Sequence, residues 1–153
     1  MLQKITWSMS NVKFGMLAKD DVDRAVEYVN SKYELDIRNR TRQGDVVFLR
    51  QIVFYFLRNR FNGTLHRLSG YFSTNGRKYD HATIIHSCNS IESDVELGLL
   101  TDRLRLIISV CDELSSLFEG NEYDEQSLYA YFLENKENIK KYLQEQNKSV
   151  TFE

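Results

Sequence analysis

The chain has 153 residues, a net charge of −2, 42% hydrophobic and 27% charged residues. This composition is typical of one soluble globular domain, or of one domain with an extension. It contains two cysteines, too few for a disulfide framework, and no apolar run long enough to span a membrane, so we expect a cytoplasmic protein without a membrane partner. The absence of proline and the scarcity of strand-like alternation favour an all-α fold.

The charge is distributed unevenly along the chain. Residues 38–91 carry nine Lys and Arg against two acidic residues, a net charge of +7. Residues 92–153 carry six basic and fourteen acidic residues, a net charge of −8. Residues 1–37 carry five basic and six acidic residues. The basic middle predicts a polyanionic partner, and the acidic end should repel that partner.

The first predicted helix covers residues 20–32 and follows an arm, residues 1–19, with no clear pattern. Asp20 or Asp21 is a suitable N-cap. The inward face is formed by Val22, Ala25, Val26 and Val29. A basic loop, residues 38–44, comes next; in most proteins such a loop is only solvated surface.

The most apolar segment, residues 46–61, predicts a buried central helix. Its length, and the arginines that interrupt it, favour a helix over a strand. Thr64 is then expected to cap a short helix over residues 65–72, with Leu65, Leu68 and Phe72 facing inward.

The segment DHATIIHSCNSI, residues 80–91, predicts a helix with a polar first turn. Asp80 is a good N-cap, and the apolar stripe consists of Ile84, Ile85, Cys88 and Ile91. A polar tip on an apolar stripe suits a recognition helix, whose first residues meet base edges in the major groove. Ordinary helix capping explains the same pattern.

This segment resembles the signature of the C-terminal DNA-binding domain of the bacterial replication initiator DnaA. The residues in register are Asp80, His81, Thr83, Ile85, His86, Cys88 and Ile91, and upstream Arg50, Gln51 and Ile52 also match. The similarity covers roughly residues 20–95. Ala82 and Ser87 are mild departures, Tyr79 stands where the family has an arginine, and the turn over residues 73–79 is longer than the family's.

The resemblance implies a helix-turn-helix domain of the DnaA C-terminal or Trp-repressor-like type that binds double-stranded DNA. Asp80, His81 and Ala82 would then contact bases in the major groove, and Arg42 would enter the minor groove. The DNA backbone would be contacted by Arg40, Arg50, Gln51, Thr64, Arg77, Lys78, Thr83 and His86. For Arg50 the alternative is an ion pair with an acid at the edge of the core.

The remaining segment, residues 96–153, predicts an acidic helical extension beyond the family domain. A heptad seam is formed by Leu97, Leu100, Leu104, Ile107, Cys111, Leu114 and Phe118. A last helix is expected from Asp124 to about Gln144. The two helices either close the domain as an antiparallel hairpin or form a surface for a homodimer or a replication protein.

No enzymatic constellation, cofactor or metal site is expected. The phosphate-binding loop of ATPases is absent, and so are the common zinc-ligand spacings, which makes Cys88 a small core residue. We therefore expect sequence-specific DNA binding in replication or transcription control, as in a bacterial or phage accessory protein. The alternative is a protein-interaction module that has kept the fold, lost DNA binding and acts through the heptad seam and the acidic C-terminal helices.

Overall fold

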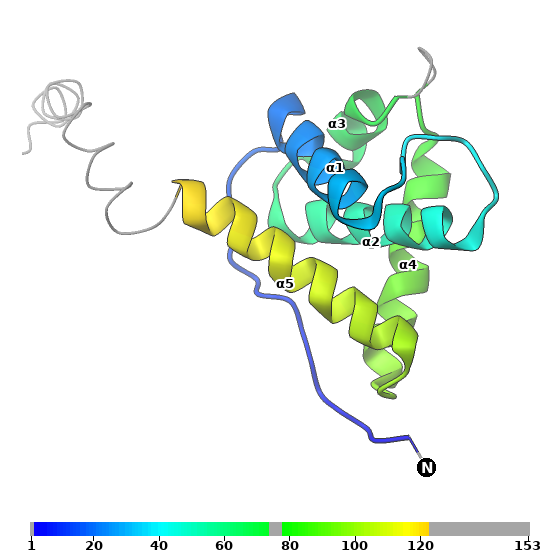
Figure 1. Ribbon diagram of the computed structural model, residues 1–153. Coiled ribbons are helices and arrows are strands. Elements are labelled where there is room, and N and C mark those ends of the chain that lie inside the picture. Colours follow the sequence, from blue (N-terminus) through cyan, green and yellow to red (C-terminus); the bar gives the residue numbers. More distant parts are fainter. Residues whose placement is uncertain (1, 74–77, 123–153) are drawn as a thin grey trace, which may run out of the picture. The chain divides into compact units, whose positions relative to one another are not determined.

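The computed structural model describes residues 2–73 and 78–122 (Figure 1). The chain divides into two compact units, Met1–Leu114 and Ser115–Glu153, and the packing described below is that of the first unit. Within the described ranges every regular element is a helix, which confirms the all-α prediction. The elements are α1 (Lys19–Tyr33), α2 (Gly44–Arg60), α3 (Thr64–Tyr71), α4 (His81–Leu97) and α5 (Asp102–Glu122).

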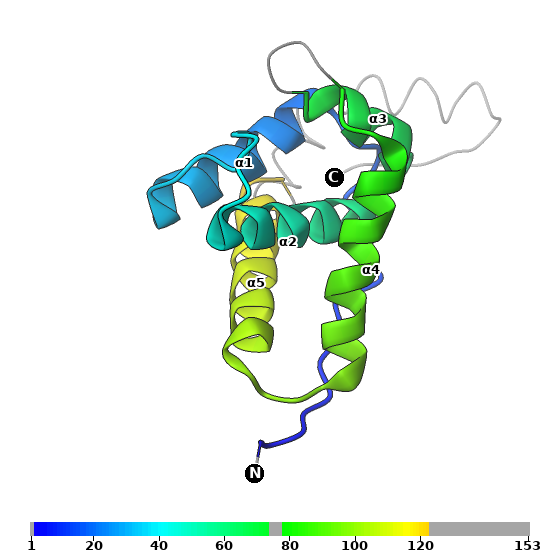
Figure 2. The same cartoon turned by 90° about the vertical axis from the view of Figure 1, so that its right-hand side faces the viewer.

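Helix α2 is the centre of the first unit. It packs against α1, α3 and α4, and Figure 2 shows it crossing α4. Its middle is buried on all sides, since Ile52, Val53, Phe54, Phe56 and Leu57 are all fully buried. A helix that is apolar all round is expected at the interior of a domain. The core predicted from the sequence is therefore confirmed around this helix.

The starts of two helices differ from the expected caps. Helix α1 begins after Ala18, whose backbone N–H donates to the Asp21 carboxylate at 2.9 Å, so Asp21 caps the helix from inside its first turn. Helix α3 begins after Gly63, and Thr64 is already helical and makes no side-chain cap. The prediction of a Thr64 cap was wrong because Gly63 adopts a left-handed conformation, with φ of 63°, that glycine tolerates without strain.

The predicted helix at residues 80–91 continues to Leu97 and ends at Gly98. Beyond Asp102, the heptad seam lies in the core of the first unit. Leu104, Ile107, Cys111 and Leu114 are buried, whereas Leu97 is 57% exposed and lies on α4. The seam over residues 104–114 is thus not a free dimer surface. The helix expected from residue 124 to 144 lies outside the described residues.

The N-terminal arm contains no helix and runs along the other elements of the first unit. Its backbone bonds to the connection between α4 and α5: Ile5 N–H donates to the Gly98 carbonyl, and Leu100 N–H donates to the Gln3 carbonyl, both at 2.8 Å. Further along, Phe14 is buried. The arm therefore closes one side of the core. None of the described helices has the length and apolar character needed to cross a membrane.

Candidate nucleic-acid interface

The first turn of α4 presents a polar, exposed tip. Asp80 is the N-cap, and its carboxylate accepts from the Ala82 N–H at 3.4 Å. His81, Ala82 and Thr83 are all exposed, as is His86 one turn later. The opposite face of the helix, which includes Ile84 and Cys88, is buried. The helix thus points its polar first turn to solvent, as a recognition helix requires.

The connection from α3 to α4 is held at Tyr79. The Ser69 hydroxyl donates to the Tyr79 carbonyl, and the Tyr79 N–H donates to the Ser69 carbonyl at 3.3 Å. The Tyr79 ring packs edge-on against Phe54 and Phe72, with centroid distances of 5.6 and 5.3 Å. The start of α4 is therefore fixed to α3 and α2. Residues 74–77 of the lengthened turn are outside the described ranges, and they include Arg77.

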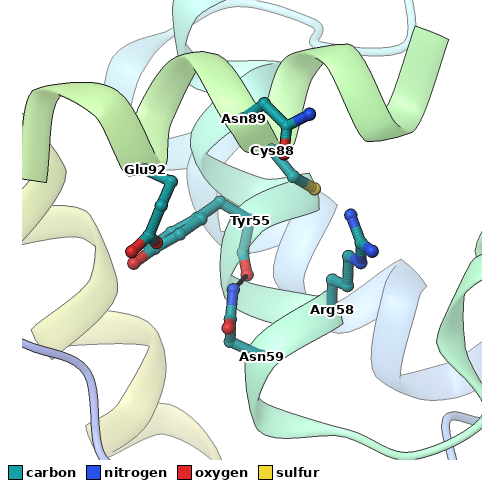
Figure 3. A pocket seen from close by; sticks show the side chains of 6 residues that line it. All are labelled: Tyr55, Arg58, Asn59, Cys88, Asn89 and Glu92. Atoms are coloured by element: carbon teal, nitrogen blue, oxygen red, sulfur yellow. Dashed lines mark hydrogen bonds between the residues drawn. The ribbon is translucent and has the colours of Figure 1, made fainter. Parts of the chain in front are cut away.

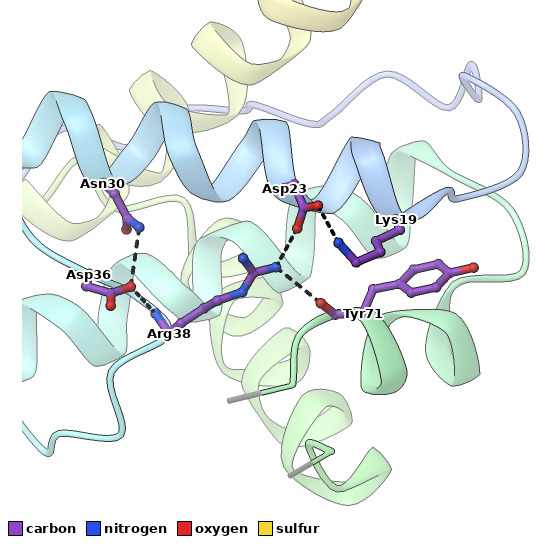
Figure 4. A network of polar contacts seen from close by, with 6 residues as sticks. All are labelled: Lys19, Asp23, Asn30, Asp36, Arg38 and Tyr71. Carbon is purple, nitrogen blue, oxygen red and sulfur yellow. Dashed lines mark hydrogen bonds and ion pairs between the residues drawn. The ribbon is translucent and has the colours of Figure 1, made fainter. Parts of the chain in front are cut away.

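The basic loop between α1 and α2 is anchored by a polar network (Figure 4). Arg38 donates to the Asp23 carboxylate at 2.9 Å and to the Tyr71 carbonyl at 3.1 Å. Asp36 accepts from the Arg38 backbone N–H at 2.9 Å and from the Asn30 side chain at 3.3 Å. These contacts tie the beginning of the loop to α1 and to the end of α3.

Arg50 of α2 holds the backbone of the same loop by hydrogen bonds. Its Nε donates to the Ile37 carbonyl at 2.7 Å, and its terminal nitrogen donates to the Asn39 carbonyl. Arg50 is only 8% exposed, and burial lowers its pKa, an effect to which the charge of Arg40 adds. Its partners are backbone carbonyls rather than the acid that the sequence offered as an alternative. In this position Arg50 orders the loop, and little of its side chain is open to a phosphate.

The loop and the first turn of α4 meet at Tyr79. The Arg40 guanidinium lies over the Tyr79 ring at 4.8 Å from its centroid, and that of Arg50 lies at 5.7 Å. Because Tyr79 directly precedes Asp80, these contacts place the basic loop beside the exposed tip of α4. Two segments far apart in the sequence, both expected to contact DNA, therefore lie together.

The other expected contact residues vary in exposure. Arg42 and Lys78 are exposed, and Gln51 and Thr64 are half-buried. His66 of α3 adds a second imidazole, with its ring 5.9 Å from that of His81. No pattern in the sequence indicates this contact or the packing of Tyr79.

The charge count of the sequence overstates the positive surface. Arg38 is paired with Asp23, and Arg50 is buried under the loop. Arg60 is also buried, with its Nε donating to the Val12 carbonyl at 2.9 Å. Three of the nine basic residues of the +7 segment thus serve the fold. Arg40 and Arg42 in the loop and Lys78 just before α4 are exposed.

The described residues contain no group of three or more His, Cys, Asp and Glu that is arranged to hold a metal ion. The chain matches no protein-family model, and no solved structure matches it.

Proposed function

We propose that this chain binds double-stranded DNA in a sequence-specific manner, with α4 as the recognition helix and the basic loop as a second contact. The observation that carries the proposal is the stacking of Arg40 on Tyr79, which puts the loop beside the first turn of α4. A recognition helix in the major groove with a basic arm in the adjacent minor groove is a known docking geometry.

The first turn of α4 reads bases in this proposal. His81 offers a donor or an acceptor, Asp80 accepts from a cytosine amino group, and the Ala82 methyl contacts a thymine methyl. All three residues are exposed in the structure. Thr83 and His86 lie on the same exposed side and contact the sugar-phosphate backbone, which fixes position rather than sequence.

In this proposal the basic loop supplies the electrostatic attraction to DNA. Arg42 enters the minor groove, whose narrow, electronegative A/T-rich form attracts a guanidinium. Arg40 contacts a phosphate with the edge of the guanidinium whose face lies over the Tyr79 ring. Arg50 is a positioning residue that holds the loop backbone, because its donors are used by carbonyl groups. Further backbone contacts come from Gln51, Thr64, Lys78 and Arg77, the last of which lies outside the described residues.

The proposal is tested by selecting the purified protein against a random duplex library at moderate salt. Enrichment of a defined motif that is lost in the His81→Ala variant would support base readout by α4. His81→Ala should lower specific affinity by about 1–3 kcal/mol. It should leave the thermal melting temperature nearly unchanged, since His81 is exposed. Binding that is unchanged at the selected site would remove His81 from the readout.

The loop is tested by the salt dependence of binding. Arg42→Ala should reduce the slope of log K against log salt by about one unit, since one phosphate contact or its equivalent is lost. Arg105→Ala is the matched control, because Arg105 is an exposed arginine on α5 whose ion-pair partner is Asp102. Equal slopes for the two variants would show that the loop does not contact DNA.

The second candidate function is a protein-interaction module of the same fold, acting on a replication protein or a second copy of the chain. The burial of Leu104, Ile107, Cys111 and Leu114 removes most of the heptad seam from this alternative. It then depends on the acidic residues of segment 92–153, with its net charge of −8. A library selection without enrichment, with only weak salt-sensitive binding, would favour it over DNA binding.

A further inference from the structure

A pocket of about 260 Å³ lies between α2 and α4, on parts of these helices that the proposed DNA contacts do not use (Figure 3). It is a shallow hollow that is widely open to solvent. Helix α2 contributes Tyr55, Arg58 and Asn59, and α4 contributes Cys88, Asn89 and Glu92. Residues three and four apart on a helix share a face, so each helix turns a polar group of side chains toward the other. The volume is just below the usual range of small-molecule pockets, which suits a small metabolite.

One end of the pocket carries an uncompensated positive charge. Figure 3 shows the Arg58 guanidinium beside the Cys88 thiol, and no ion pair joins it to a carboxylate among the residues that the structure describes. Burial raises the pKa of the Cys88 thiol and outweighs the lowering by Arg58, so the sulfur is a neutral neighbour. A guanidinium with free donors beside a neutral group is suited to bind a carboxylate.

The other end carries a carboxylate that is held in place. Figure 3 shows Glu92 on the opposite side of the pocket from Arg58, next to the Tyr55 hydroxyl. Burial, followed by the nearby Glu92 carboxylate, raises the pKa of Tyr55, so the phenol stays protonated beside that carboxylate. The Asn59 amide donates to the Tyr55 carbonyl at 2.8 Å, which holds the Asn59 side chain in place in the pocket wall.

We propose that this pocket binds a small zwitterion of the α-amino acid class, with the ligand carboxylate at Arg58 and its ammonium group at Glu92. The amides of Asn59 and Asn89 line the space between the two charges. A molecule with both charges satisfies both ends, whereas a simple anion or a simple amine satisfies only one. The proposal does not rest on DNA binding, since ligand binding is measured directly.

The experiment is a titration of the isotope-labelled protein, followed by the backbone amide resonances, with glycine, L-alanine and L-serine as probes. At least one of them should give saturable shifts at Arg58, Asn59, Asn89 and Glu92. Acetate and methylamine, which each carry one of the two charges, should bind roughly tenfold more weakly or less, because each loses a charge-assisted contact. An absence of saturable shifts with all three amino acids up to millimolar concentrations would overturn the proposal, and so would equal binding of acetate.

The site is assigned by variants. Arg58→Gln should weaken binding of the best probe roughly tenfold or more, because it removes the charge that holds the carboxylate. Arg105→Gln changes an exposed arginine outside the pocket and should bind as the unmodified protein does. Asn89 is exposed, so Asn89→Ala should fold normally and still lose affinity. Unchanged affinity in folded Arg58→Gln, or in Asn89→Ala, would place the ligand elsewhere.

Discussion

Replacing Tyr79 by leucine removes the ring on which the proposed DNA-binding surface is assembled. Leucine keeps an apolar side chain in a site that is only 8% exposed. It loses the edge-on contacts with Phe54 and Phe72 and the stacking under Arg40 and Arg50. The backbone hydrogen bonds between Tyr79 and Ser69 do not depend on the side chain and should remain.

The magnitude follows from these contacts. Each edge-to-face aromatic pair contributes about 0.5–1.5 kcal/mol beyond burial, and a cation over a ring contributes about 0.5–2 kcal/mol. Because leucine fills part of the space and the contacts are not additive, we expect the free energy of unfolding to fall by about 1–3 kcal/mol. DNA affinity should fall roughly tenfold, since reordering one or two loop residues on binding costs about 1–2 kcal/mol each.

The assay pairs urea denaturation with DNA binding at a temperature where the variant is folded. Phe48→Leu is the matched control, because Phe48 of α2 lies under Arg103 at 4.1 Å. That variant also loses a ring under an arginine, but the arginine is Arg103 of α5 rather than a residue of the loop, so its DNA affinity should not change. A stability loss below about 0.5 kcal/mol for Tyr79→Leu would show that the ring is not a structural anchor. A stability loss of the expected size with unchanged DNA affinity would separate the loop from the interface.

Two further predictions concern stability. Gly98→Ala should destabilise the fold by more than about 1–2 kcal/mol, because φ is +69° and an added Cβ would lie 2.5 Å from the Ile5 carbonyl oxygen; thermal and urea denaturation measure this. Burial acts to raise the pKa of Asp23, but hydrogen bonds from Lys19 and Arg38 hold it below its usual value. Because its pKa is lowered, the Asp23 carboxylate stabilises the fold above the unfolded-state pKa, and this stabilisation is lost as pH falls through the folded-state pKa. The free energy of unfolding of Asp23→Asn should therefore fall less in acid than that of the parent protein.

Each of these predictions has a control or an opposite outcome. Gly70 lies inside α3, and an added Cβ there meets nothing within 4 Å, so Gly70→Ala should leave stability unchanged or raise it slightly. A loss in Gly70→Ala as large as that in Gly98→Ala would show that the Ile5 contact is not the cause. If the free energy of unfolding falls with acid to the same extent in Asp23→Asn and in the parent protein, the ion pairs of Asp23 do not persist in solution.

Local patterns in the sequence predicted most of the helices. The apolar period at residues 20–32, the continuous apolar run before Arg60 and the Asp80 cap each specify a helix from neighbouring residues, and the structure has all three. The prediction of a Thr64 cap was wrong because Gly63 adopts a left-handed backbone conformation, which the residue preferences for N-caps do not predict. The apolar stripe from Leu104 to Leu114 was predicted correctly. An apolar stripe alone does not indicate whether it packs against its own chain or against another chain.

The candidate site depends on contacts that local patterns do not contain. Nothing in the spacing of Arg40 and Tyr79 indicates that one lies over the other, and the family resemblance presented Tyr79 only as a missing arginine. The burial of Arg50 likewise results from the path of the loop, which turns two carbonyls toward it. Arg58 and Glu92 come to line the same pocket only through the crossing of α2 and α4.

The pairing of the N-terminal arm with the end of α4 has a consequence for the order of folding. Gln3 and Ile5 bond to residues at the far end of the first unit, so these contacts close almost the longest loop that it contains. Such closure carries a large entropic cost until the intervening helices are in place, and high contact order slows folding. On a ribosome the arm is made before Gly98 and Leu100, and it has no partner until these residues have been made. Its amides should therefore gain protection last in a pulsed hydrogen-exchange experiment, and lose it first as the protein opens.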